Sequence, residues 1–150
     1  MRPVVVAVTA TVLAIVGPAM GAPTSTSPLG LWLAVNGQTG KPRAAIRIFE
    51  NNGKFYGRIE KIFNPADATK TCVDCPGDRA GKPVVGLEIL RGLSPDGNLR
   101  WSGGTVLDPR DGAIYDASLR LIDGGRKLVL RGYLLFSFLG GSETLVRGTK

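Results

Sequence analysis

Closely spaced turn signals divide most of this chain into short segments, and they constrain its fold more than any other feature. Asn51-Asn52-Gly53 predicts a hairpin turn, because asparagine and glycine adopt the positive φ angles that short hairpins need. Ser94–Asn98, Asp108–Gly112 and Asp123–Gly125 mark further turns. The chain has 21 glycines and 10 prolines, and no apolar pattern of helical period follows residue 21. Short strands joined by tight turns are therefore expected.

Eight segments have the length and composition of β-strands. They are Leu29–Val35, Arg43–Glu50, Lys54–Phe63, Val84–Leu93, Leu99–Leu107, Ala113–Ile122, Arg126–Tyr133 and Ser142–Arg147. The alternation is clearest in the sixth segment, where Tyr115, Leu119 and Leu121 share an apolar face. The opposite face of that segment is mostly polar, as in an antiparallel sheet that buries one side.

These strands predict an all-β protein. Since closure of a sheet removes its exposed edges, we predict a single antiparallel up-and-down β-barrel of about eight strands. A two-sheet sandwich is the alternative, and the sequence does not separate the two. An eight-stranded barrel is either filled by its own side chains or holds one small ligand. Residues 64–83 form a long loop between the third and fourth strands, and loops of that length are usually functional or disordered.

The first 21 residues have the layout of a secretory signal peptide. The apolar run Val4–Val16 follows Arg2, and small residues precede the expected cleavage point. The run is shorter than the roughly 20 apolar residues that cross a bilayer. We predict a signal peptide at 1–21, a flexible lead-in at 22–28 and a barrel domain at 29–150, exported to a bacterial periplasm or out of the cell. An uncleaved anchor is the alternative, but we expect no transmembrane segment in the mature chain.

The composition argues against several classes of function. The sequence has no histidine, which removes the commonest general base and metal ligand. The net charge is +7, but the basic residues are scattered along the chain, so we expect no nucleic-acid binding. Glu60 and Glu88 are candidates for an acid–base pair, yet an ion pair of Glu88 with Arg91 is the simpler interpretation. We expect no enzymatic activity, no cofactor and no metal site.

Both cysteines of the chain lie in the long loop, as Cys72-Val73-Asp74-Cys75. In an oxidising compartment a structural disulfide is the favoured interpretation, and it would hold the loop locally. A thioredoxin-like redox site is the second interpretation, although no βαβ context surrounds the motif. Zinc is the third, although two cysteines without histidine leave the ion short of ligands unless two chains share it.

Gly30-Leu31-Trp32 opens the first strand and resembles the lipocalin signature. That resemblance implies that Trp32 closes the base of the barrel and that a late arginine packs over its ring. Arg147, in the last strand, is the matching residue, and the contact is a cation–π interaction. Gly30, Trp32 and Arg147 are therefore the predicted barrel-closure residues. They indicate architecture and not activity.

A wider resemblance begins at the long loop. The residues that carry it are Gly81–Leu93, Trp101, Gly103-Gly104, Asp108-Pro109, Gly112, Tyr115, Leu130–Tyr133 and Leu139-Gly140, together with Cys72–Asp78. In order and spacing they resemble the bacterial secreted proteins of domain-of-unknown-function family 2147, from about Leu29 to Arg147. Members of that family often carry a tryptophan near the C-terminus that is missing here. The resemblance implies a small exported, lipocalin-like barrel without established chemistry.

The late strands supply candidates for a binding site. Trp101, Tyr115, Arg131 and Tyr133 are predicted to face the barrel interior and to bind a small amphipathic or apolar ligand, with Arg131 at an anionic headgroup. The alternation in the seventh strand allows either Arg131 or Leu130 to point inward. The alternative function is an envelope structural or interaction protein, whose filled barrel holds no small ligand.

Overall fold

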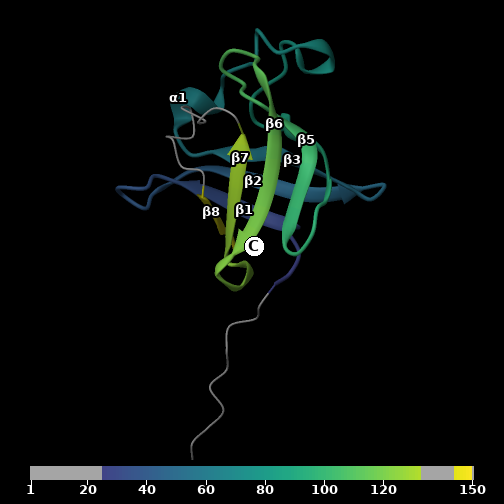
Figure 1. The fold of residues 1–150 in the computed structure, drawn as a ribbon. Coiled ribbons are helices and arrows are strands. Elements are labelled where there is room, and N and C mark those ends of the chain that lie inside the picture. The colour runs from purple at the N-terminus through teal and green to yellow at the C-terminus, as the bar shows by residue number, and fades with distance from the viewer. Residues whose placement is uncertain (1–24, 133–143, 150) are drawn as a thin grey trace, which may run out of the picture.

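The fold is a closed barrel of eight antiparallel strands, each paired with its neighbours in chain order, and β8 also pairs with β1 (Figure 1). The computed structural model describes residues 25–132 and 144–149. The strands are β1 Gly30–Val35, β2 Pro42–Asn51, β3 Lys54–Ile62, β4 Glu88–Pro95, β5 Arg100–Leu107, β6 Ile114–Ile122, β7 Lys127–Gly132 and β8 Thr144–Arg147. Three short helical turns, α1 Pro65–Ala68, η1 Gly77–Arg79 and η2 Asp123–Gly125, lie in the connections. The predicted up-and-down barrel is confirmed, and the sandwich is excluded.

The predicted signal peptide lies outside the described residues, as do residues 22–24 of the lead-in and Tyr133. Most strand boundaries lie within one or two residues of the prediction, and the largest difference is at β4, which begins at Glu88 and not at Val84. The Val84 amide bonds to the Lys70 carbonyl in the long loop, and Leu87 then turns back onto the Val84 carbonyl. Gly86 adopts a φ of 92° in this turn. The apolar run therefore belongs partly to the loop, a distinction that periodicity cannot make.

The interior of the barrel is filled by apolar side chains. Ala117, Leu119 and Leu121 of β6 are buried while Asp116 and Arg120 are exposed, which confirms the predicted alternation. The inward side chains at the centre are 0% exposed, among them Trp32, Ile46, Ile59, Ile89 and Leu128. Because a void large enough for water leaves part of its lining accessible, no such void touches these residues.

The base of the barrel is closed by Trp32 and Arg147, which are paired across β1 and β8. The Arg147 guanidinium lies 4.2 Å from the centroid of the Trp32 ring. Its nitrogens also donate to the carbonyls of Gly125 at 2.7 Å, Leu29 at 3.0 Å and Ser27 at 2.8 Å. Burial lowers the pKa of this guanidinium from its usual value. One arginine therefore ties together the N-terminal lead-in, the turn before β7 and the last strand.

Gly30 lies beside the same contact. Its φ of +121° favours glycine, and a Cβ there would lie 3.4 Å from Nη1 of Arg147, in van der Waals contact. Trp32 is held from its other end, since its Nε1 donates to the Pro28 carbonyl at 2.7 Å. The three predicted barrel-closure residues thus meet at one point.

Trp32→Ala should reduce the free energy of unfolding by about 3–5 kcal/mol, because a fully buried indole is lost. Arg147→Ala should cost less. The two effects should not add, since the side chains touch. Denaturant unfolding of both single variants and the double variant measures the coupling, with Arg58→Ala as a control at a surface arginine. Additive losses would remove the proposed role of the contact in closing the base.

Candidate functional site

The structure places the predicted ligand residues in different environments. Trp101 faces inward, is 6% exposed and packs at a tilt against Phe55, with 5.8 Å between ring centroids. Tyr115 is half-buried and packs against the core. Arg131 is exposed on the outer face. The described members of the set therefore share no pocket, and their roles in ligand binding remain predictions.

The inward orientation predicted for Arg131 is wrong. Leu128 and Leu130 of β7 are 0% and 3% exposed, so their side of the strand fills the core. Arg131 lies between Leu130 and Gly132 and must point the other way, because successive side chains alternate across a strand. The burial of two leucines decides this orientation, which the alternation had left open.

On the outer face of β5, β6 and β7, Arg131 lines an open groove of about 850 Å³. The three strands lie side by side in Figure 1. The lining residues are Ser102, Gly103, Gly104, Thr105, Asp116, Ala117, Ser118, Arg131 and Gly132. Most of them are small, so the backbone forms much of the floor of the groove.

A row of small residues explains why the groove lies here. Gly104 is paired with Ala117, and Ala117 with Gly132, across the three strands. A Cβ at Gly104 would lie 2.6 Å from the backbone nitrogen of Leu93, and one at Gly132 would lie 2.8 Å from a methyl group of Val106. The backbone at Gly104 therefore lies close to the backbone of β4, and Gly132 lies close to the core residue Val106, so neither position has room for a side chain. The groove lies over this row of small residues.

A bulge in β5 adds to the shape of the groove. The register between β5 and β6 shifts between Trp101 and Gly104, which leaves Ser102 and Gly103 out of the regular ladder. Gly103 has a φ of +73°, and a Cβ at this position would meet nothing within 4 Å. Such bulges re-aim side chains at the edge of a site. Here the bulge leaves open space directly over the backbone.

The groove carries hydroxyl groups and two charges. Ser102, Thr105 and Ser118 supply the hydroxyls, and Asp116 and Arg131 the charges. The Ser102 hydroxyl donates to Asp96 at 2.6 Å. Within residues 25–132 and 144–149, the side chains of Asp116 and Arg131 form no ion pair or hydrogen bond with the protein. Both are available to a ligand.

The end of the barrel at which β3 finishes is covered by the long loop (Figure 1). Cys72 and Cys75 form a disulfide within it, with their Cα atoms 5.3 Å apart, as predicted. Both cysteines are buried and belong to the core cluster. The Cys72 amide bonds to the Lys82 carbonyl at 2.8 Å, and the Gly81 amide to the Cys72 carbonyl at 2.7 Å. The disulfide thus stabilises a cap over the filled interior.

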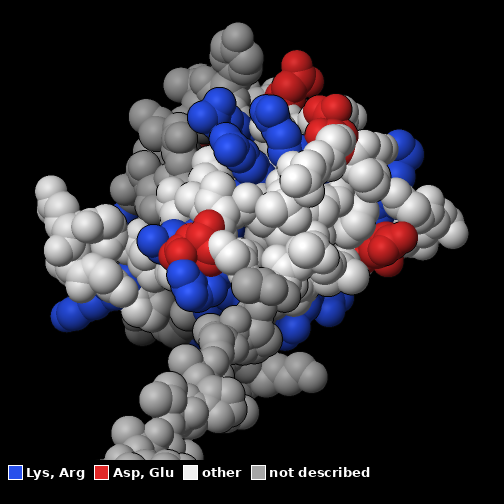
Figure 2. Space-filling model, turned by 60° about the horizontal axis from the view of Figure 1, so that its bottom comes forward, with Lys and Arg blue, Asp and Glu red and all other residues white. Residues whose placement is uncertain are grey.

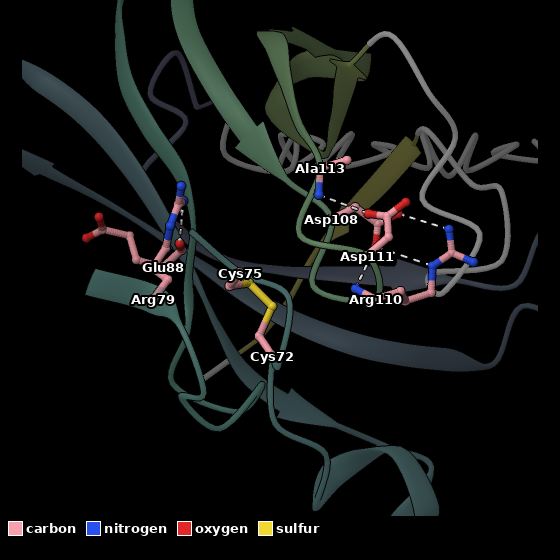
Figure 3. The surroundings of a disulfide bond; sticks show 8 residues. All are labelled: Cys72, Cys75, Arg79, Glu88, Asp108, Arg110, Asp111 and Ala113. Atoms are coloured by element: carbon pink, nitrogen blue, oxygen red, sulfur yellow. Dashed lines mark hydrogen bonds and ion pairs between the residues drawn. A yellow bond between two sulfur atoms is a disulfide. The ribbon is translucent and has the colours of Figure 1, made fainter. Parts of the chain in front are cut away.

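The turn between β5 and β6 packs against this cap (Figure 3). A Cβ at Gly112, where φ is +71°, would clash with the Asp74 carbonyl, so the approach requires glycine. Asp108, 5% exposed, accepts from the Arg110 backbone and guanidinium, each at 3.0 Å. These contacts hold the turn in place against the loop that carries the disulfide.

Arginine–carboxylate pairs fasten the cap to β4. Arg91 lies between Asp78 at 2.7 Å and Glu88 at 2.5 Å. The buried Arg79 donates to the Glu88 carbonyl at 3.2 Å, and burial lowers the pKa of its guanidinium. Glu60 pairs instead with Arg47 at 2.8 Å. The two candidate catalytic glutamates, Glu60 and Glu88, are therefore each held in a separate ion pair. For Glu88 this is the predicted pair with Arg91.

Two further observations concern ligands and membranes. Among the described residues, no three His, Cys, Asp or Glu side chains are grouped so that they could hold a metal ion. In the same part of the chain, no helix has the length and apolar character needed to cross a membrane.

A barrel with this closure and strand order has the architecture of the lipocalins. It is similar to a solved structure described as "Protein HP1028 from the human pathogen Helicobacter pylori belongs to the lipocalin family", with a TM-score of 0.65 and 21% identity over 83% of this chain and 85% of that one. The chain belongs to the family described as "Uncharacterized protein conserved in bacteria (DUF2147)", which matches residues 30–147. No curated protein matches it.

The sequence interpretation missed most of the groove. Four of its residues lie in strands that were predicted: Ser102, Thr105, Asp116 and Ser118. Polar residues on the solvent-facing side of a strand are common, so their sequence pattern does not mark a binding site. The small residues at Gly104, Ala117 and Gly132 were the available clue. They occupy inward positions where bulky side chains usually fill a core, and only the register shows that they adjoin.

The ion pair with Arg91 holds the pKa of the Asp78 carboxyl at about 2, below its usual 3.8, mainly through hydrogen bonds from the guanidinium. A depressed carboxyl pKa stabilises the folded state above pH 3.8, and the contribution is lost as the pH falls through 2. Asp78→Asn should therefore destabilise the protein at pH 6 and have little effect near pH 2. Urea unfolding at both values tests this, with Asp74→Asn as the control for removing a loop charge. An equal loss at both pH values would contradict it.

Thiol counting on the denatured protein should find no free cysteine. Replacing Cys72 and Cys75 together with serine should preserve the barrel and cost about 2 kcal/mol by the loop-entropy relation for such a short ring. Circular dichroism reports the barrel, and the rate of tryptic cleavage after Lys70 or Arg79 reports the cap. Unchanged cleavage would show that the disulfide does not hold the cap.

Proposed function

We propose that this protein is a non-catalytic binding protein of the bacterial cell envelope, in which a filled barrel serves as scaffold and the outer groove of β5, β6 and β7 takes a small polar ligand. The observation that carries the proposal is the groove itself. It combines about 850 Å³ of open volume with two charged side chains, Asp116 and Arg131, that have no partner in the described residues.

The filled interior argues against the predicted amphipathic ligand within the barrel. Such a ligand would have to displace side chains such as Ile46, Ile59 and Leu128, which are 0% exposed. Displacing packed core residues costs several kcal/mol, because their contacts are lost before new ones form. The alternative function, an envelope protein without an internal ligand, therefore agrees better with the filled interior. We add to it a ligand site in the outer groove.

Export is supported by the layout of the first 21 residues and by the disulfide. A non-catalytic role is supported by the lack of histidine in the sequence and by the ion pairs of Glu60 and Glu88.

The chemistry of the groove favours a ligand rich in hydroxyl groups, such as a sugar. The Asp116 carboxylate accepts hydrogen bonds, Arg131 donates them, and serine and threonine hydroxyls do both. A Cβ at Gly103 would meet nothing within 4 Å, so there is open space over the backbone for a sugar ring. The side chains that line the groove are small or polar, so an acyl chain would meet no large apolar side chain there.

Amide NMR shifts on titration with D-glucose should map to residues 102–105, 116–118 and 131–132. Ser118→Trp, which places an indole in the groove, should abolish them. Ile114→Trp is the matched control, since Ile114 is 44% exposed on the outer face of the same strand and does not line the groove.

A fluorescent fatty acid tests the competing interior site. It should show no saturable binding, because the interior is filled. Saturable binding that shifts the amides of Leu119 and Leu128 would overturn the proposal in favour of an internal ligand. Glucose shifts that survive Ser118→Trp would also contradict it.

A further inference from the structure

The arginines of this protein divide into two groups. Most of those in the described residues have a partner. Arg47 pairs with Glu60, Arg91 with Asp78 and Glu88, Arg110 with Asp108, Arg126 with Asp123, Arg79 and Arg147 with backbone carbonyls, Arg58 lies over Phe49, and Arg43 also has a partner. In the same residues, only Arg100, Arg120 and Arg131 have none.

The three unpartnered arginines lie on neighbouring strands and on the same outer face. Arg100 of β5 is directly opposite Arg120 of β6. Arg120 is in turn opposite Val129 of β7, two residues from Arg131. All three arginines are exposed. Side chains directly opposite across an antiparallel pair have Cβ atoms about 5 Å apart, and diagonal neighbours about 7–8 Å apart, so the three guanidinium groups can reach one point.

This arrangement is unfavourable for the protein alone. Like charges directly opposite each other on two strands destabilise a sheet. Asp96 and Asp116 form no ion pair with these arginines in the described residues; Asp96 accepts from Ser102, and Asp116 lies four residues from Arg120 along β6. Figure 2 shows Lys and Arg side chains in several groups on one face of the protein, with Asp and Glu side chains beside some of these groups. A bound anion would relieve the repulsion that the protein leaves in place.

The cluster also adjoins the groove. Arg131 belongs to both, because it is paired with Ser118 and lines the groove beside it. Asp116 and Thr105, which are opposite each other, lie further along the strands, away from Arg100 and Arg120. A ligand lying along β6 would therefore meet a carboxylate and hydroxyls at one end and positive charge at the other.

We propose that Arg100, Arg120 and Arg131 bind the phosphate group of a phosphorylated sugar whose hydroxyl groups lie in the groove. The sugar part rests on the proposed function, and the phosphate part rests on the arginines alone. A phosphate monoester carries close to two negative charges and three acceptor oxygens. Guanidinium groups match it with paired, charge-assisted hydrogen bonds.

Calorimetric titration of the purified protein at low salt with glucose 6-phosphate, D-glucose and inorganic phosphate tests the proposal. Glucose 6-phosphate should bind at least about tenfold more tightly than glucose, because charge-assisted bonds are added. The double variant Arg100→Gln/Arg120→Gln should lose that gain and bind both sugars alike. Arg58→Gln is the control, since Arg58 is exposed on the outer face of β3 and remote from the groove. Thermal unfolding verifies that each variant is folded.

The outcomes separate the two proposals. Inorganic phosphate that binds through the arginines, with no gain from the sugar, would support the anion site and reject the sugar groove. Glucose and glucose 6-phosphate that bind equally to the wild type would support the groove and overturn the anion site. Arginine-dependent binding to phosphatidylglycerol vesicles without binding of glucose 6-phosphate would overturn the soluble ligand in favour of a membrane surface. An effect of Arg58→Gln as large as that of the double variant would reduce the site to general surface charge, and overturn it.

Discussion

Closure of the barrel depends on the short seam between β1 and β8, where Arg147 lies across Trp32. In the described residues three residue pairs form this ladder, so its backbone contributes less than the longer β2–β3 pairing. The guanidinium compensates by bonding three carbonyls from the lead-in and the η2 turn while it stacks on the indole. If this seam opened, the sheet would have two free edges, and its apolar inner face would be exposed to solvent.

A closed and solid barrel moves the binding surface to the outside. The inner faces of the strands are complementary enough to leave the central side chains without accessible surface. Gly104, Ala117 and Gly132 have little or no side chain. At both glycines the backbone lies so close to neighbouring atoms that a Cβ would not fit. The same packing that removes an internal cavity thereby creates the hollow on the outer face of β5, β6 and β7.

Charge is distributed unevenly over this scaffold. At the capped end, arginines are matched with carboxylates, as in the pairs of Arg91 with Asp78 and of Arg110 with Asp108. On the outer face of β5, β6 and β7, three arginines have no partner in the described residues. Exposed ion pairs contribute little stability each, but several around one loop restrain it together. The matched charges therefore serve the structure, and the unmatched ones are the part of the surface that is free to bind.

The local sequence determined the strands, their order and the residues that close the base. Turns such as Asn51–Gly53 act over a few residues, and Gly30, Trp32, Arg147 and the paired cysteines each have a role that depends on local geometry or residue type. Four matters depended on the tertiary structure: the start of β4, the side of β7 that faces inward, the filled interior and the groove. Alternation defines two faces of a strand but not which one is buried, because burial depends on the register and packing of neighbours far away in the chain. The adjacency of Arg100, Arg120 and Arg131 has the same origin, since only the pairing of three strands brings these separate positions to one face.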